Sequence, residues 1–213
     1  MFQLIDMDQW ERREHYQYYD EKLKCVYSIT ADLDVTALQK KVKEKHLRFY
    51  PAFVYCAARA VNAAREFRMG TDAEGNPGFW DVMHPSYTIF HEDDHTFSDL
   101  WTFYDESFSA FYQSMTADMA LYGKKKGVKV KAGQPQNFFC ISCVPWLNYS
   151  GYHTACVDSR PNLFPILTFG RYQEEGGRVK MPFTVTIAHA AADGYHTSKF
   201  IQDLQKIIDE AVF

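Results

Sequence analysis

The chain has 213 residues, with 23 Lys and Arg against 27 Asp and Glu, which gives a formal net charge of −4. Hydrophobic residues make up 46% of the chain and charged residues 23%, and these values exclude a disordered or fibrous protein. Nucleic-acid binding depends on a basic surface, so a mildly acidic chain is not expected to have a nucleic-acid partner. The length predicts one domain over residues 1–213.

The start of the chain and its cysteines predict a compartment. The sequence begins MFQLIDMDQWE, which lacks the basic and then apolar segments of a secretory signal, and its five cysteines are an odd number. A reducing, cytoplasmic location is therefore expected. The longest uncharged run, residues 132–157, contains Gln, Asn and Pro residues, so no membrane span is expected.

Helical periodicity appears in four segments, taken in chain order. Asp34 can cap a first helix that has Val35, Leu38 and Val42 on one face. Pro51 suits the first turn of a second helix, whose sequence AFVYCAARAVNAA is apolar on nearly all sides and predicts burial. Apolar residues three and four apart predict a third helix over 108–122 and a fourth over 200–211.

Short β-branched or aromatic segments between these helices predict strands. They are Cys25–Thr30, Gly78–Met83, Tyr87–Phe90, Phe138–Val144, Pro165–Arg171 and Met181–Ala188. The order mixes strands and helices without a strict βαβ alternation, and the glycine-rich phosphate-binding fingerprints are missing from the sequence. The expected fold class is α/β, an α+β two-layer sandwich in which a mixed β-sheet is packed with helices.

The segment TVTIAHAAADGYH, residues 184–196, holds the first candidate for chemistry. Alternation along the strand places His189 on the apolar side with Val185 and Ile187, followed by three alanines and the turn Asp193-Gly194. The imidazole pKa lies near neutrality, so a histidine with such small neighbours suits general-base catalysis. A structural core histidine is the alternative, and it is the more frequent role of a lone histidine at a strand end.

Ser142 is a second candidate, because it lies near the end of the apolar strand FFCISCV. A backbone-bonded core serine is the competing interpretation. A hydrolase triad of Ser142, His189 and Asp193 is not favoured, since Ser142 lacks the glycine-framed elbow that exposes a nucleophile.

No metal site is predicted. Cys140 and Cys143 form a C-x-x-C, but residues three apart on a strand point to opposite faces and cannot share a metal or a disulfide. The HEDDH run at 91–95 lies between strand signals without a further ligand at fixed spacing, so we expect a solvated acidic turn.

Several segments together resemble one family, the type A chloramphenicol acetyltransferases. They include WERREHYQYY at 10–19, RFYPAFVYCAARAVN at 48–62, FWDVMHPSYTIFHEDDHTFSDL at 79–100, ISCVPWLNY at 141–149, PILTFGRYQEEG at 165–176 and HAAADGYH at 189–196. The resemblance covers essentially the whole chain in order. Its most specific parts are the H-x-x-x-D-G signature that begins at His189, the I-S-x-x-P-W strand end and W-x-R-R-E-H.

The resemblance implies acetyl transfer from acetyl-CoA, as co-substrate, to a hydroxyl of a small molecule, with chloramphenicol as the leading candidate. It implies neither a metal nor a covalent acyl-enzyme. His189 would be the general base, Ser142 would donate a hydrogen bond to the tetrahedral oxyanion, and Thr168 would assist through water. Asp193 would pair with Arg12 and hold the His189 loop in shape.

The family resemblance also implies a homotrimer with its sites at the subunit interfaces, where one chain supplies His189 and its neighbour supplies Ser142 and much of the acceptor pocket. The implied acceptor-pocket residues are Tyr18, Tyr19, Cys25, Tyr27, Phe97, Tyr152 and Thr154. The implied CoA-side residues are Tyr50, Trp146 and Tyr172, with Arg48 and Arg171 as phosphate contacts.

The sequence departs from the family pattern at a few positions. Ala188 stands where the family usually has a histidine before the catalytic one, and Cys140 stands where an asparagine is common. Tyr27, Tyr152 and Thr154 make the implied acceptor pocket more polar. Two alternatives therefore stay open: the same fold acting on a different hydroxyl or amine acceptor, and a non-catalytic ligand-binding trimer.

Overall fold

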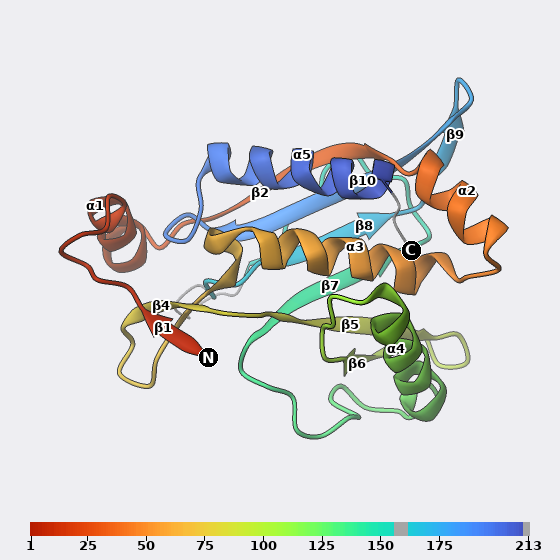
Figure 1. Cartoon of the computed structure of the whole chain (residues 1–213), viewed down its shortest axis with the longest axis horizontal. Helices are drawn as coiled ribbons and strands as arrows, with labels where there is room; N and C mark the ends of the chain where they lie inside the picture. Colours follow the sequence, from red (N-terminus) through yellow and green to blue (C-terminus); the bar gives the residue numbers. More distant parts are fainter. Residues whose placement is uncertain (156–161, 211–213) are drawn as a thin grey trace.

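A mixed sheet of seven strands forms the centre of the fold in the computed structural model, which describes residues 1–155 and 162–210 (Figure 1). Its strands are β2 (Val26–Asp34), β5 (His84–His91), β6 (Thr96–Trp101), β7 (Phe138–Val144), β8 (Ile166–Gly170), β9 (Gln173–Glu175) and β10 (Arg178–Ala188). The strand order is β2-β10-β8-β7-β5-β6, with β9 paired to β10 off this path. β7 runs parallel to β5 and β8, and the remaining pairs are antiparallel.

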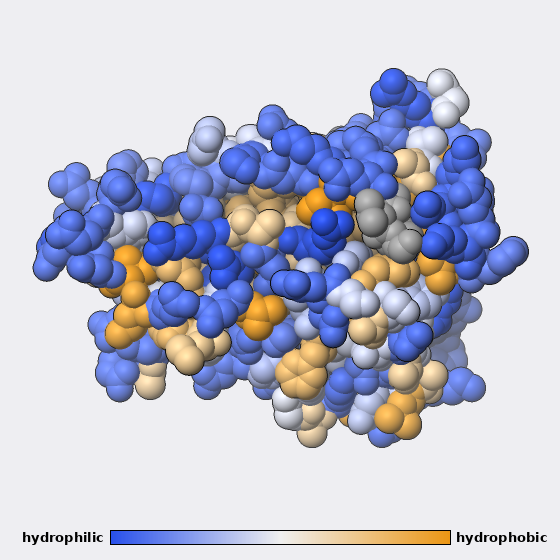
Figure 2. All heavy atoms as spheres, viewed as in Figure 1, coloured by the Kyte–Doolittle hydropathy of each residue, from blue (hydrophilic) through white to orange (hydrophobic). Residues whose placement is uncertain are grey.

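Helices pack on this sheet, so the predicted fold class is confirmed. They are α1 (Arg13–Gln17), the π-helical turn η1 (Tyr18–Lys22), α2 (Thr36–Glu44), α3 (Phe49–Ala63), the 3₁₀ turn η2 (Arg65–Arg68), α4 (Phe108–Tyr122) and α5 (Gly194–Glu210). Figure 1 shows α3 and α5 lying across one face of the sheet, and α1 beyond the end where β10 finishes. Hydrophilic residues cover the outward surface of α5 and α2 (Figure 2).

A second sheet of three strands lies beside the first. It has the order β1-β4-β3, with β1 (Phe2–Leu4), β4 (Pro77–Trp80) and β3 (Met69–Thr71). The predicted strand Gly78–Met83 is therefore wrong in extent, because residues 81–83 leave the strand. Asn62 explains the exit, since its side-chain oxygen accepts the backbone N–H of Met83 at 2.7 Å and its amide donates to the Met83 carbonyl at 2.9 Å.

The predicted elements otherwise agree with the structure except at their ends. The first strand continues to Asp34 because Leu33, 1% exposed, pairs with Met181 of β10. The last helix begins earlier than predicted, at Gly194, because the Asp193 carboxylate accepts the backbone N–H groups of the first turn. Ala211, where the prediction ended, and Cys156 lie outside the described residues.

The sequence did not predict β6, α1, the turns η1 and η2, or the short strands β1, β3 and β9. β6 contains the polar residues Ser98 and Asp99, which hide its alternation, and it is held by antiparallel pairing with β5. Residues 92–95 of the HEDDH run form the turn between these two strands, as predicted, and Asp93 and Asp94 both contact Lys126. The prediction is wrong for His91, which ends β5 and is buried, with Nε2 2.8 Å from the Ser98 hydroxyl.

The two faces of the main sheet have different chemistry. Phe183 of β10 lies with its ring centroid 6.0 Å from Phe53 of α3 and 6.5 Å from Phe200 of α5, so this side of β10 faces the helices. Because side chains alternate along a strand, Thr184 and Thr186 point to the opposite face. They pair there with hydroxyls of β2, at 2.7 Å to Thr30 and 2.6 Å to Ser28.

Phe53 is central to the helix-side core. Its side chain is fully buried, and its ring centroid lies 4.6 Å from Phe169 of β8. We expect Phe53→Ala to lower the free energy of unfolding by about 3–5 kcal/mol, through lost burial and the cavity left behind. Urea titration followed by circular dichroism measures this change.

Leu121→Ala is the control, because Leu121 is 64% exposed on α4. It should change the free energy of unfolding by no more than about 0.5 kcal/mol. Equal effects of the two substitutions would contradict the placement of the core.

Candidate active site

His189 follows directly after β10, the longest strand of the sheet. Its backbone N–H donates to the Cys25 carbonyl at 2.8 Å, which continues the pairing of β10 with the segment leading into β2. Ala190, Ala191 and Ala192 form the buried turn that follows. The backbone at His189 is thus held by the sheet on one side and by a closely packed turn on the other.

The His189 ring is fixed by stacking. It lies parallel to the Tyr19 ring, with 3.7 Å between centroids and an interplanar angle of 13°, and 5.2 Å from the Tyr27 ring. Its Nδ1 is buried without a hydrogen-bond partner among the described residues. Nε2 is therefore the nitrogen that is left to contact a substrate, and the catalytic role of this histidine stays a prediction.

Asp193 and Arg12 brace the turn that carries His189. Arg12 Nη1 donates to Asp193 Oδ2 at 2.6 Å, and Arg12 Nη2 donates to the His189 carbonyl at 3.4 Å. The Arg12 side chain is 15% exposed, so this ion pair is partly shielded from water. The pairing implied for these two residues is present, and it reaches the backbone of His189 directly.

The Asp193 carboxyl is ionised in this setting. Burial alone would raise its pKa, but hydrogen bonds from His196 and Arg12 outweigh burial and lower the pKa from 3.8 to about 2. Asp193 does not act as a third member of a hydrolase triad, because its contacts are Arg12, His196 and the first turn of α5.

Ser142 lies on β7, on the sheet face opposite the helices. It pairs in register with Thr168 of β8, which pairs with Thr184 of β10. Its hydroxyl is 3.1 Å from that of Thr88 on β5. If Thr88 is the donor in this contact, the Ser142 hydroxyl hydrogen remains available to a third group.

Ser142 and His189 of one chain do not meet. His189 is five residues beyond Thr184, and Ser142 is two strands away from Thr184. At about 3.3 Å per residue and 4.8 Å per strand, these two residues are about 19 Å apart. One chain therefore carries the two groups at separate places, and no reacting atom can contact both.

The residues implied for the acceptor pocket divide between these two places. Tyr19, Cys25 and Tyr27 lie around His189, and Tyr18 packs edge-on against Tyr19 at 5.2 Å. Thr154 is close to the same strand end, where it lines a cavity of about 30 Å³ with Val26 and Ala188.

Phe97 and Tyr152 are not part of that group. Phe97 is 53% exposed on β6, at the far edge of the sheet from β2, and Tyr152 packs against Tyr149 at 5.8 Å. The Tyr27 hydroxyl, expected to make the pocket more polar, is bonded instead to Thr197 of α5 at 2.6 Å. Burial is the main cause that raises the Tyr27 pKa to about 12.

The residues implied for the CoA side gather near the Ser142 half of the sheet. Trp146 follows β7, is 56% exposed and packs edge-on against Phe90 at 4.6 Å. Tyr172 follows β8, and its ring centroid lies 5.8 Å from that of Phe49 on α3. Tyr50, which follows Phe49 in α3, donates a hydrogen bond from its hydroxyl to the Thr88 carbonyl. Arg48 and Arg171 flank these aromatic residues and are both exposed.

Three residues that contact the predicted site residues were not identified from the sequence. Thr88 contacts Ser142, Tyr149 donates its hydroxyl to the Thr168 carbonyl at 2.8 Å, and His196 contacts Asp193. Tyr149 and Thr168 are consequently packed together, and Thr168 is only 1% exposed. Only His196 had a sequence signal, since it lies three residues after Asp193 at the start of a helix.

Cys140 and Cys143 are not joined by a disulfide and, three apart on β7, point to opposite faces of the sheet. Among residues 1–155 and 162–210, no group of three or more His, Cys, Asp or Glu is arranged to hold a metal ion. None of the helices described combines the length and apolarity needed to cross a membrane.

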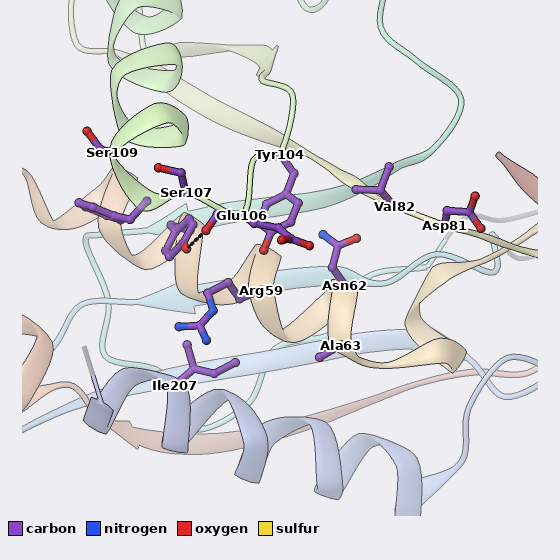
Figure 3. A pocket seen from close by; sticks show the side chains of 12 residues that line it. Arg59, Asn62, Ala63, Asp81, Val82, Tyr104, Glu106, Ser107, Ser109 and Ile207 are labelled. Atoms are coloured by element: carbon purple, nitrogen blue, oxygen red, sulfur yellow. Dashed lines mark hydrogen bonds between the residues drawn. The ribbon is translucent and has the colours of Figure 1, made fainter. Parts of the chain in front are cut away.

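A cavity of about 910 Å³ opens elsewhere, on the helix side of the fold (Figure 3). Figure 3 shows Arg59 and Asn62 of α3 on one wall and Tyr104 on another. None of the residues that the sequence predicted for the catalytic, acceptor or CoA sites lines this cavity. Volume alone therefore does not identify the site of chemistry in this protein.

The sequence comparisons with known proteins agree on one family. A sequence model described as "Chloramphenicol acetyltransferase" matches residues 1–205. The chain is 38% identical over 206 residues to a chloramphenicol acetyltransferase of Clostridium butyricum, covering 97% of this chain and 94% of that protein. It is 39% identical over 207 residues to one of Vibrio anguillarum, with the same coverage of both. A solved structure named chloramphenicol acetyltransferase shares the fold, with a TM-score of 0.85, 24% identity, and coverage of 98% of this chain and all of that one.

The depressed pKa of Asp193 predicts acid sensitivity. Its pKa is lowered from 3.8 to about 2 in the folded chain, so its contribution to stability is fully present above pH 3.8 and is lost as the pH falls toward 2. We expect the unfolding temperature of the parent to fall more steeply between these pH values than that of Asp193→Asn. Differential scanning calorimetry at a series of pH values tests this, and parallel curves for the two proteins would refute it.

Proposed function

The chain belongs to the chloramphenicol acetyltransferase family, and on that premise we propose that it transfers the acetyl group of acetyl-CoA to a hydroxyl of chloramphenicol. The observation that carries the proposal is the setting of His189: a ring stacked on Tyr19, with Nδ1 enclosed and Nε2 as the remaining nitrogen. Such a ring is preorganised for proton transfer, because the orientation of its plane and the nitrogen that faces the substrate are fixed before the reaction begins.

His189 acts as the general base in this proposal. Its Nε2 removes the proton of the acceptor hydroxyl while the oxygen attacks the thioester carbonyl carbon, so that a C–O bond forms. When the intermediate collapses, the C–S bond breaks and the proton passes from His189 to the departing sulfur. Asp193 and Arg12 take no proton, and they hold the turn through the His189 carbonyl.

Ser142 stabilises the oxyanion of the tetrahedral intermediate. Its hydroxyl is 3.1 Å from that of Thr88, and a hydrogen bond from Thr88 leaves the Ser142 hydrogen directed at the intermediate. A preorganised donor of this kind contributes about 10²–10³ in rate. Thr168, its neighbour in register on β8, is proposed to assist through a water molecule.

The separation of His189 from Ser142 supports a site assembled from two chains. About 19 Å lies between these groups in one chain, so the His189 end of one copy has to meet the Ser142 side of another. Such a contact joins two different surfaces, and contacts of this type close into rings under cyclic symmetry. We propose a homotrimer, as the family resemblance implies.

The predicted pocket residues divide differently from what the resemblance implied, which gave much of the pocket to the chain that carries Ser142. Tyr18, Tyr19, Cys25 and Tyr27 accompany His189 from one copy, and Phe97 belongs to the other copy. On the Ser142 side, the exposed rings of Trp146 and Tyr172 suit stacking against the adenine of CoA. The exposed guanidinium groups of Arg48 and Arg171 suit its phosphates.

Acceptor identity is tested by measuring the release of free CoA with chloramphenicol and with a panel of hydroxyl and amine compounds. Saturable turnover of chloramphenicol is the expected result. Turnover of another compound alone would reject the antibiotic as acceptor and keep the acetyl transfer. Tight binding without turnover of any compound would instead support a non-catalytic ligand-binding protein.

His189→Ala should lower the turnover number by about 10²–10⁴, because a general base is lost. Ser142→Ala should lower it by about 10²–10³ through loss of the oxyanion donor. Both variants should keep the oligomeric state and unfolding temperature of the parent. Activity of His189→Ala within tenfold of the parent would refute the general-base role.

Mixed oligomers of these two variants test the shared site. In a trimer that contains both variants, one of the three interface sites joins a chain that retains His189 to one that retains Ser142, so about one third of the parent activity should return. The variants are co-expressed with different affinity tags, and oligomers carrying both tags are assayed. Mixed oligomers as inactive as the separate variants would place each site within a single chain.

A further inference from the structure

His196 holds one oxygen of the carboxylate that braces the His189 turn. Its Nδ1 lies 2.8 Å from Asp193 Oδ1, while Arg12 Nη1 lies 2.6 Å from Asp193 Oδ2. Both oxygens of Asp193 are therefore held, each by a different side chain. His196 is 20% exposed and Asp193 33% exposed, so the contact is largely shielded from water.

The chemistry of Asp193 assigns the proton on His196. An ionised carboxylate only accepts hydrogen bonds, so His196 Nδ1 must carry hydrogen at 2.8 Å from it. The other nitrogen, Nε2, lies 3.9 Å from a carboxylate oxygen of Glu66 on η2.

Charged groups of several elements surround this imidazole. The Arg12 guanidinium is the nearest cation, with Nη1 3.5 Å from His196 Nδ1. These side chains line a cavity of about 410 Å³. Its lining includes Arg12, Glu66, Asp193 and His196, together with Glu11, His15 and Arg65. The nearest charges are the two carboxylates of Asp193 and Glu66 and the one guanidinium of Arg12.

We propose that His196 is a positioning residue for acetyl transfer, which acts through Asp193 and Arg12 on His189; this inference rests on the proposed function. The chain of contacts runs from Glu66 to His196, Asp193, Arg12 and the carbonyl of His189. It joins η2, α5 and the segment before α1, which are distant in sequence. His196 contacts none of the reacting groups.

Loss of the imidazole would leave Asp193 Oδ1 with only the backbone N–H groups of residues 195 and 196, at 3.0 and 3.3 Å. These groups cap α5 but do not fix the rotation that aims Oδ2 at Arg12. Arg12 would then hold the His189 carbonyl less well. A shift of about 1 Å in a catalytic group can cost about 10²-fold in rate, so a remote contact of this kind affects turnover.

The test compares His196→Ala with His196→Asn, because the asparagine amide can place a donor where Nδ1 lies. His196→Ala should lower kcat by about 10- to 100-fold, with KM for both substrates changed less than about twofold, whereas His196→Asn should stay within about threefold of the parent. Ser198→Ala, an exposed position on the same helix, is the matched control and should leave kcat unchanged.

A double-mutant cycle adds a second measurement. In an Arg12→Leu background, His196→Ala should reduce kcat by less than about twofold further, because both substitutions disable the same brace. Equal losses in His196→Ala and His196→Asn, a change confined to KM, or full additivity with Arg12→Leu would each overturn the proposal. Unfolding temperatures of all variants are measured to confirm folded protein.

A parent enzyme without turnover on any acceptor would reject the proposed function, and the inference about His196 is then decided by chemical modification. The rate of His189 modification by diethyl pyrocarbonate, followed by peptide mass spectrometry, reports the accessibility of that ring. This rate should rise in His196→Ala and stay at the parent value in His196→Asn. An unchanged rate in His196→Ala would overturn the positioning role.

Discussion

The register of β10 is the constraint on which the rest of this structure depends. Its residues 180–188 pair with β2, residues 183–186 with β8 and residues 178–180 with β9. Because side chains alternate along a strand, a slip of one residue would turn Phe183 and Val185 away from the helices and bring threonines into the core. The same slip would displace His189 from Tyr19. One set of backbone hydrogen bonds therefore sets both the core and the candidate base.

The two faces of the sheet divide stability from chemistry. On the helix side, Phe53, Phe169 and Phe183 form a dry core that leaves little room for polar groups. On the other side, hydroxyls of neighbouring strands bond one another in pairs, as in Thr30–Thr184 and Thr88–Ser142. Mutual pairing makes buried hydroxyls tolerable, because each one has a hydrogen-bond partner. The polar face thus stays ordered without a helix packed against it.

Aromatic residues make up 16% of the chain, and they have several different roles in the structure. Some fill the core, while the Tyr19 ring fixes the plane of His189 and the exposed rings of Trp146 and Tyr172 lie near the Ser142 half of the sheet. The Tyr27 hydroxyl was expected to make the acceptor pocket more polar. It instead forms a hydrogen bond with Thr197 of α5 within the same chain. The sequence alone does not reveal whether the ring or the hydroxyl of a tyrosine faces a ligand.

Short-range patterns in the sequence determined a large part of this protein. The alternation in β10, the position of His189 at its end and the helices over 49–63 and 108–122 depend on residues within a few positions of one another. The HxxxDG motif and the other matching segments likewise identified the family, because each is read along the chain. Even the opposite orientation of Cys140 and Cys143 followed from strand geometry alone.

Only the tertiary structure decided which distant groups meet. β6 was missed because it is held by pairing with β5 and not by a local apolar pattern. The contact of Thr88 with Ser142 spans 54 positions and that of Arg12 with Asp193 spans 181, and their distances depend on strand pairing and helix packing. The separation of Ser142 from His189 likewise follows from register across three strands. Periodicity specifies which face a residue occupies, whereas long-range packing specifies what it touches.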